Sequence, residues 1–322
     1  MIGFATIAAV QNSYTLNVSP TSFIVGDYTS YTFSFTMADA LASSGFIVIT
    51  LDPNLSFTTA QISTITSNLS VSISSTSIKA SPTVQVTTTT IGSLTYYQLS
   101  LSNLNTTNSN IATQSISITV GNLLNCPSVC TLTLFSLSTY YTSSTIDLVA
   151  NANFSSSIVL QPGSISLLNA NSIATTTYTF TTISLTFSIQ NSIPSGGHLA
   201  VILPSDLTLL NFCTSSLSVS GSSIAITSVN IVASNAISIT ITNAFIFKNS
   251  QLTVAISNIM TQNSTKTTAT FIVKSYDSTS IAIDVSSNSL GLTISSGNSF
   301  NTISLSRSSA INSDAANYTI NF

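Results

Sequence analysis

Alternation of apolar with hydroxyl side chains is the dominant pattern along this chain. It is clearest in five segments: YTFSFTM (31–37), YQLSLS (97–102), SISITV (115–120), SLTFSI (184–189) and ISITIT (237–242). Successive side chains of a strand point to opposite faces, so the pattern gives each strand one apolar and one polar face. Such strands recur about every 10–15 residues, with Gly, Pro, Asn or Ser between them. This spacing predicts an all-β fold of antiparallel β-sandwiches, with at most one helical turn, in ADALASS (38–44).

The order of short motifs shows an internal repeat. Five motifs of the first half return in the second half in the same order. The pairs are TFSF (32–35) with TFSI (186–189), SGFIVITLDP (44–53) with GGHLAVILP (196–204), SLSN (100–103) with TITN (240–243), SITVGNLL (117–124) with TVAISNIM (253–260), and TLFSLSTYYTSSTID (133–147) with TFIVKSYDSTSIAID (270–284). We therefore expect two copies of one domain, at residues 15–160 and 161–300. The first copy is longer, and its extra residues are expected around a loop at 79–93.

Both ends of the chain resemble parts of these copies. Residues 303–322 align with residues 16–35 at one constant offset, which places Tyr318 on Tyr31 and Phe322 on Phe35. Residues 2–14 resemble residues 290–300, so we interpret 1–14 as the tail strand of a preceding repeat rather than as a signal peptide. We expect residues 301–322 to be the opening strands of a further repeat or a donor strand, within a longer array.

The low charge limits the classes of partner. Charged residues make up 4% of the chain, there is no Glu, and the net charge is -3, whereas about a quarter of a typical domain is charged. Without a basic patch, nucleic acid is not an expected partner. No apolar run reaches the roughly 18–20 residues of a membrane helix, so no membrane insertion is expected in this segment. A hydrophobic content of 43% argues against disorder.

With so few charges, solubility must come from hydroxyls, amides and attached N-linked or O-linked glycans. The number of Asn-X-Ser/Thr sites is no greater than chance gives for a chain so rich in Asn, Ser and Thr. The candidate acceptors are Asn17, Asn54, Asn68, Asn105, Asn153, Asn263 and Asn317.

Three cysteines are present. Cys126 and Cys130 bracket the turn CPSVC, and in an extracellular setting they are candidates for a small disulfide, the alternative being two buried thiols. Cys213 stands apart. It is either a buried thiol or an unpaired residue that crosslinks to another chain or to one of the other two cysteines.

Residues suited to catalysis or metal binding are scarce, so we expect no enzyme, no cofactor and no metal site. The single histidine, His198, can formally be combined with Asp206 and a serine, but its counterpart in the first copy lies near Phe46, which favours a structural role. Four Cys and His residues in total are too few and too scattered for zinc. Asp147 and Asp284 occupy similar places in the two copies, where a strand end or a turn is favoured over a calcium site.

Aromatic residues have two interpretations. Phe33, Phe35, Phe135, Phe187 and Phe271 occupy apolar positions of the alternation and are assigned to the cores. The tyrosines are either core and sheet-surface residues, which we favour, or the lining of a sugar-binding face. The candidates for such a face are Tyr28, Tyr31, Tyr96, Tyr97, Tyr140 and Tyr141.

A phrase of the form Y-T-F-x-F, a turn, and an apolar strand ending in Pro resembles the tandem immunoglobulin-like units of large surface proteins of ciliates and other protists. The residues that carry the resemblance are Tyr31, Thr32, Phe33, Phe35, Gly45 and Pro53, then Thr186, Phe187, Ile193, Pro194, Gly196, Gly197 and Pro204. It implies immunoglobulin-like sandwiches at an extracellular location. Cys213 matches a Cys that often follows the Pro in such units, although the first copy has Thr58 or a neighbour there.

We therefore expect a structural repeat segment of an extracellular surface or filament-forming protein. Its expected partners are copies of itself, joined through β-strand and domain–domain contacts. The alternative is an adhesin or carbohydrate-binding surface module.

Overall fold

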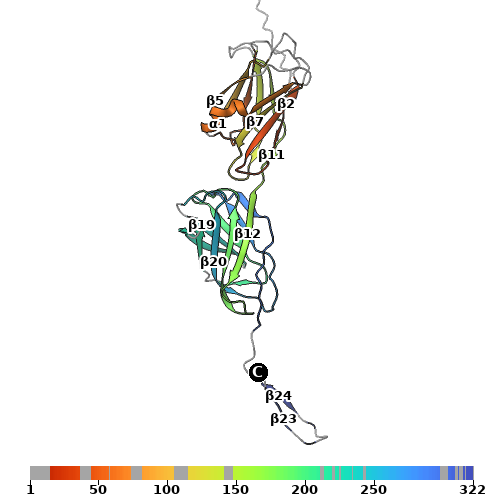
Figure 1. Cartoon of the computed structure of the whole chain (residues 1–322), viewed down its shortest axis with the longest axis vertical. Coiled ribbons are helices and arrows are strands. Elements are labelled where there is room, and N and C mark those ends of the chain that lie inside the picture. The colour runs from red at the N-terminus through yellow and green to blue at the C-terminus, as the bar shows by residue number, and fades with distance from the viewer. Residues whose placement is uncertain are drawn as a thin grey trace, which may run out of the picture. The chain divides into compact units, whose positions relative to one another are not determined.

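The structure is a computed structural model, and it confirms the all-β prediction. It describes residues 15–36, 45–57, 59–73, 82–104, 115–140, 148–210, 214–297 (without 220, 221, 225, 234, 242 and 243) and 304–321 (without 309, 310, 312–314 and 316). The chain divides into unit 1, Met1–Gly163 with Ile281–Asp284, and unit 2, Ser164–Ser280 with Val285–Phe322. Each contains an immunoglobulin-like antiparallel β-sandwich (Figure 1). No helix in these ranges is long and apolar enough to cross a membrane.

Unit 1 has two main sheets. The first has the order β1 (Asn17–Pro20), β2 (Tyr28–Thr36), β7 (Ser115–Leu124), β4 (Leu69–Ile73). The second has the order β10 (Leu148–Asn153), β9 (Ser136–Tyr140), β3 (Phe46–Thr50), β6 (Leu94–Ser102), β5 (Thr83–Ile91). β8 (Thr131–Leu132) pairs with β11 (Ile158–Val159), and α1 (Thr59–Thr64) with the 3-10 helix η1 (Ile65–Asn68) precedes β4.

The region 79–93, predicted as a loop, contains the nine-residue strand β5, which pairs along its length with β6. The loop prediction was therefore wrong. Thr87–Thr90 hide the alternation because Thr suits either face of a strand at the edge of a sheet. The short helix α1 was not predicted, because Ile62, Ser63 and Thr64 are exposed and its sequence has no apolar stripe. The helical turn expected at 38–44 lies outside the described residues.

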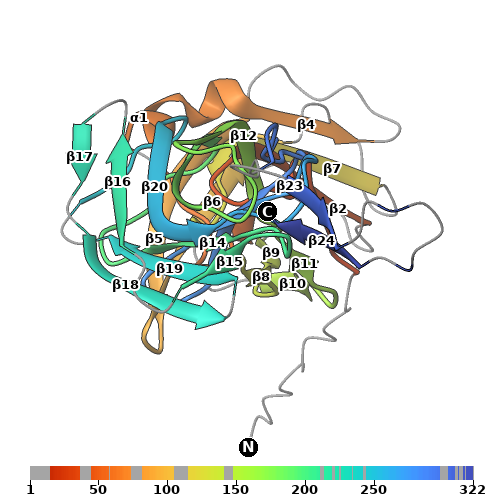
Figure 2. The same ribbon diagram turned by 90° about the horizontal axis from the view of Figure 1, so that it is seen from below.

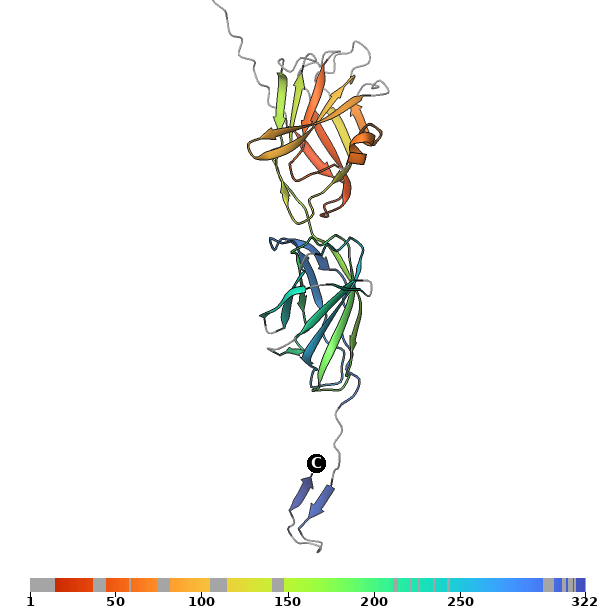
Figure 3. The same cartoon turned by 90° about the vertical axis from the view of Figure 1, so that its left-hand side faces the viewer.

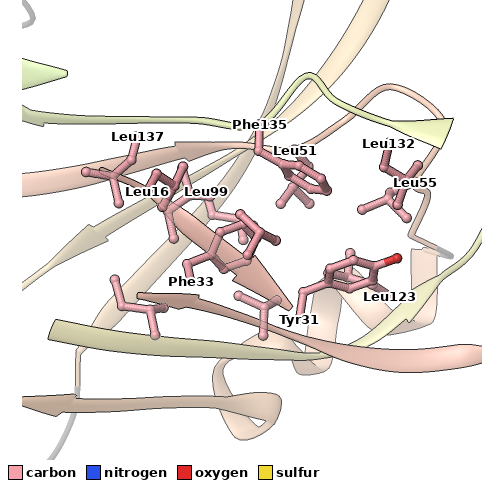
Figure 4. Close-up of a cluster of buried hydrophobic side chains, with 14 of the residues drawn as sticks. Leu16, Tyr31, Phe33, Leu51, Leu55, Leu99, Leu123, Leu132, Phe135 and Leu137 are labelled. Atoms are coloured by element: carbon pink, nitrogen blue, oxygen red, sulfur yellow. The ribbon is translucent and has the colours of Figure 1, made fainter. Parts of the chain in front are cut away.

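The core of unit 1 follows from the alternation. Along β2, Tyr31, Phe33 and Phe35 are buried while the residues between them are half-buried. Figure 4 shows the rings of Tyr31 and Phe33 facing Leu99 and Leu137, which come from β6 and β9 of the other sheet. Phe33 meets Phe135 edge to face with ring centroids 5.9 Å apart, the arrangement that aromatic pairs prefer. The assignment of all five phenylalanines to the cores is confirmed.

Unit 2 repeats this arrangement with a continuous ladder. One layer has the order β17 (Ser222–Ile224), β16 (Ser215–Val219), β20 (Gln251–Met260), β13 (Phe180–Ile189), β12 (Gly163–Ser172). The ladder goes on through β22 (Ala282–Ser286), of which only Val285 and Ser286 fall in unit 2 by the division above. It then continues through β21 (Ile272–Tyr276), β14 (His198–Ile202), β19 (Ala236–Ile241) and β18 (Ile226–Ala233). The short strand β15 (Thr208–Leu209) also pairs with β20. Figure 2 shows β16 between β17 and β20.

Strand register sets the correspondence between the units. Both β7 and β20 carry a bulge with a left-handed Asn, Asn122 (φ 59°) and Asn258 (φ 56°), at an offset of 136 (258 − 122). Phe35 pairs with Ile116 and Phe187 with Leu252, which has the same offset. Phe187 is thus the counterpart of Phe35. The sequence alignment of TFSF with TFSI, which placed Phe187 on Phe33, was therefore wrong by two residues. A period-two sequence matches itself after such a slide.

Two further strands, β23 (Ser304–Arg307) and β24 (Tyr318–Asn321), form a separate antiparallel hairpin (Figure 3). This element corresponds in sequence to residues 17–34, which form β1 and β2.

Candidate functional site

His198, the one candidate for catalysis, has a structural environment. Its ring stacks on Tyr276, with centroids 4.7 Å apart and planes at 11°. Partial burial lowers the pKa of the imidazole, and the negative charge of Asp277 opposes that shift. In unit 1, Phe46 stacks on Tyr140 at the same 4.7 Å. Because both pairs are Cα partners in equivalent strands, His198 takes the place of a phenylalanine.

Asp206 does not reach His198. His198 is the first residue of β14, which ends at Ile202, and Asp206 lies four residues beyond that end. The strand alone spans about 13 Å between His198 and Ile202. Asp206 instead accepts a hydrogen bond from Lys266 Nζ at 2.9 Å and another from the Ala269 backbone N–H at 3.0 Å. The bond from Lys266, followed by that from Ala269, lowers the pKa of the Asp206 carboxyl. Asp206 is therefore engaged with Lys266 and Ala269 rather than with His198.

A buried carboxylate has the same role in unit 1. Asp52 is 1% exposed, and its Oδ2 accepts from the backbone N–H groups of Thr133 (2.8 Å) and Leu134 (2.9 Å). Its Oδ1 accepts from the Asn54 N–H at 3.0 Å. Thr133 and Ala269 correspond at the offset of 136 (269 − 133), so each carboxylate ties the end of one strand to the segment that leads into β9 or β21. Both are structural anchors.

Tyr31 is fully buried in the unit 1 core, and its hydroxyl is hydrogen-bonded. Its hydroxyl donates to Asn125 Oδ1 at 2.6 Å, and the Asn125 side chain donates in turn to the carbonyls of Ile24 (2.7 Å) and Ser22 (3.3 Å). Burial raises the pKa of the Tyr31 phenol, and the negative charge of Asp52 raises it further. The neutral hydroxyl is therefore a fixed donor, and it ties β2 to the loop before it.

The described residues contain no group of three His, Cys or Asp side chains placed to hold a metal ion. Asp284 is fully buried in β22, and Asp147 lies outside the described residues. A disulfide joins Cys126 to Cys130, with Cα atoms 6.6 Å apart. Cys213 is not among the described residues.

Most glycosylation candidates lie on the surface. Asn17, Asn54, Asn153, Asn263 and Asn317 are exposed, and Asn68 is partly buried. Asn105 lies outside the described residues. The exposed acceptors sit in both units and in the hairpin segment, so attached glycans would be distributed along the chain.

The five candidate tyrosines that the structure describes do not form one aromatic face. Tyr31 and Tyr96 are buried, Tyr97 meets Phe57 edge to face, and Tyr140 is covered by Phe46. Tyr28 is exposed, and Tyr141 is not described.

The sequence interpretation missed an exposed pair, Phe245 and Phe247, which are 53% and 71% exposed. Their ring centroids lie 5.2 Å apart. The signal was present in FIF (245–247), where burial of the central Ile246 turns both neighbours outward by the same alternation.

The hairpin 304–321 has an exposed face with three large apolar side chains. Leu305, Tyr318 and Ile320 are each 60% exposed or more. Cross-strand pairing of Leu305 with Ile320 and of Arg307 with Tyr318 puts these side chains on one face. A two-stranded hairpin is marginally stable in water unless such a face is covered. The geometry therefore makes this hairpin the candidate interface.

No family model matches the chain, and no curated protein matches it. The solved structures that it matches include a bacterial hydrophobin, BslA (15% identity, TM-score 0.28, 41% of this chain and 99% of that chain). Another is the Corynebacterium diphtheriae major pilin SpaA (11% identity, TM-score 0.29, 91% and 64%). A third is the C-terminal domain of the Streptococcus agalactiae AgI/II polypeptide BspA (10% identity, TM-score 0.26, 86% and 97%). Similarity this low carries no argument about function, and the fold assignment rests on the strand topology.

Proposed function

We propose that this chain is a structural repeat segment of an extracellular surface or filament-forming protein, assembled through β-strand and domain–domain contacts. One observation carries the proposal: the same opening hairpin occurs three times in one register. Its central Cα pairs are Val18↔Phe33, Ala170↔Leu185 and Leu305↔Ile320. Modules that recur in series along one chain, as in repeat arrays, are typical of structural proteins.

The chemistry of the chain supports an exterior location. A short disulfide persists in oxidising compartments and is rare in the cytosol. Only five Lys and Arg residues offer sites to trypsin-like proteases in 322 residues. The charged side chains near the strand ends, Asp52 and Asp206, are engaged in structural hydrogen bonds. These features fit a durable surface component. The resemblance of the sequence to the immunoglobulin-like units of ciliate and protist surface proteins agrees with an extracellular repeat.

The experiment is immunogold electron microscopy of intact cells that make the protein, using antibodies against unit 2. The proposal predicts labelling without permeabilisation, with the gold arranged along a surface layer or filaments. An antibody against a cytosolic protein of the same cells is the control for membrane integrity. Label that appears only after permeabilisation would contradict an extracellular role.

The second candidate, an adhesin or carbohydrate-binding module, is favoured by the exposed pair Phe245 and Phe247. Exposed aromatic ring faces can stack on the apolar faces of sugars. A glycan array comparing the wild-type chain with Phe247→Ala tests it, with Phe23→Ala as a control at an exposed aromatic of unit 1. A signal that Phe247→Ala removes and Phe23→Ala leaves supports this function; no signal above background excludes it for the glycans on the array.

A further inference from the structure

The hairpin 304–321 repeats the strand register of the opening hairpin of unit 1 pair by pair. Every Cα pair of β23 with β24 is a pair of β1 with β2 moved by 287 positions (305 − 18). Two hydrogen bonds beyond the strands are also repeated at that offset. They are Ser308 N–H to Asn317 O and Asn317 N–H to Ser308 Oγ, which match Thr21 N–H to Ser30 O and Ser30 N–H to Thr21 Oγ1.

Burial is the difference between the two hairpins. Leu305, Tyr318 and Ile320 are 65%, 62% and 60% exposed. Their counterparts Val18, Tyr31 and Phe33 are 8%, 0% and 0% exposed. The same strand pair therefore exists once with its apolar face covered and once with that face in solvent.

Unit 1 shows what covers this face. The second edge of β2 pairs with β7, with Tyr31 opposite Val120 and Phe33 opposite Ile118. From the other layer, the Phe135 ring lies 6.0 Å from Tyr31 and 5.9 Å from Phe33. Tyr318 keeps the phenol that in unit 1 donates to Asn125. The partner that suits the hairpin is thus a β7-like strand edge backed by an apolar sheet.

In the two sandwiches that the structure describes, that position is already occupied. β7 pairs with β2 in unit 1, and β20 pairs with β13 in unit 2. We propose that residues 304–321 are an interaction segment whose partner is a β-sandwich of this same repeat that lacks its own first two strands. β24 pairs along the open β7-like edge, and Leu305, Tyr318 and Ile320 enter the core. This deepens the proposed function, but its test is done in solution and is independent of location in the cell.

The direct test is a graft in the full chain, in which residues 16–35 are replaced by the sequence of residues 303–322. Unit 1 should keep a cooperative thermal unfolding transition of its own, measured by calorimetry and by near-ultraviolet circular dichroism of its tyrosines. The matched control is the same graft with Ile320→Asp, which places a charge opposite Ile118 and should abolish the transition. Loss of the unit 1 transition in the unmodified graft would overturn the proposal, as would its retention in the Asp control.

A capture experiment identifies the partner in trans. The acceptor is the full chain with a specific protease site inserted between residues 36 and 45, cut so that its own first hairpin is held only by non-covalent contacts. The donor is the labelled intact chain in large excess. The cut acceptor should retain at least ten times as much of the intact donor as of a donor that lacks residues 303–322. Equal retention of the two donors would contradict the proposal. An uncut acceptor that retains as much donor as the cut one would also contradict it, because the occupant would then be a complete second copy.

Discussion

His198 stacks on Tyr276 with the ring geometry that joins Phe46 to Tyr140 in the other sandwich. A titratable ring has thus taken an aromatic position between neighbouring strands, where it packs face to face with its partner. This relationship gives the histidine a structural role, and it has a consequence for the pH dependence of unit 2.

The variant His198→Phe should make the stability of unit 2 less sensitive to acid. Burial lowers the pKa of folded His198 below the unfolded value of 6.5, so the unfolded state binds more protons as the pH falls through 6.5. Wild-type stability should therefore decline below that pH relative to the variant, and the two should run parallel above it. Urea unfolding of both proteins between pH 8 and pH 5 measures this. A difference that is constant over the whole range would contradict the assignment.

Removal of the Tyr31 hydroxyl should destabilise unit 1. Tyr31→Phe leaves the buried Asn125 Oδ1 without its 2.6 Å donor, and an unsatisfied buried acceptor costs about 1–3 kcal/mol. Tyr178→Phe, at an exposed position of unit 2, is the control and should have no effect. Chemical denaturation measures both. An unchanged midpoint for Tyr31→Phe would show that the hydroxyl bond makes no net contribution.

Asp52 should be the more costly of the two anchoring carboxylates to remove. It is buried and accepts three backbone hydrogen bonds, whereas Asp206 accepts one backbone bond and one from the half-exposed Lys266. Since a hydrogen bond to a charged group is worth about 1.5–3 kcal/mol, Asp52→Ala should lower the free energy of unfolding by at least that amount. Asp206→Ala should cost less. The reverse order in equilibrium unfolding would refute this account.

The bulge in β7 should tolerate glycine better than valine. Asn122 has φ 59°, a left-handed conformation that Asn and Gly adopt readily and β-branched residues do not. Asn122→Val should therefore cost about 1–2 kcal/mol, and Asn122→Gly should be close to neutral. Thermal melts of the two variants compare them directly. Similar melting temperatures would mean that the bulge relaxes to another conformation.

The sequence predicted the strands of this fold well where apolar and hydroxyl residues alternate strictly, as in β2, β7 and β20. It failed at β5, because a run of threonines suits both faces and carries no periodic signal. The repeat was aligned two residues out at Phe187 for a related reason: a period-two pattern matches itself after a slide of two, and only hydrogen-bond register decides between the matches.

The candidate interface could be predicted in part. The match of 303–322 with 16–35 identified the segment, and the register of β23 with β24 agrees with it pair by pair. The sequence could not show that Leu305 and Ile320 are exposed, because an alternating pattern does not reveal whether a second layer covers the apolar face of a strand. It also missed Phe245 and Phe247, since apolar residues in an alternating chain are assigned to cores by default.

Amide hydrogen exchange of the full chain, resolved for residues 17–34 and 304–321, tests the central claim most directly. The two hairpins share one register, so any difference in protection between them reports the covering layer alone. We expect 17–34 to be protected for hours, and 304–321 to exchange at the first time point and gain protection when the cut acceptor is added. Protection of 304–321 equal to that of 17–34 in the chain alone would contradict the claim, because the hairpin would already have its partner.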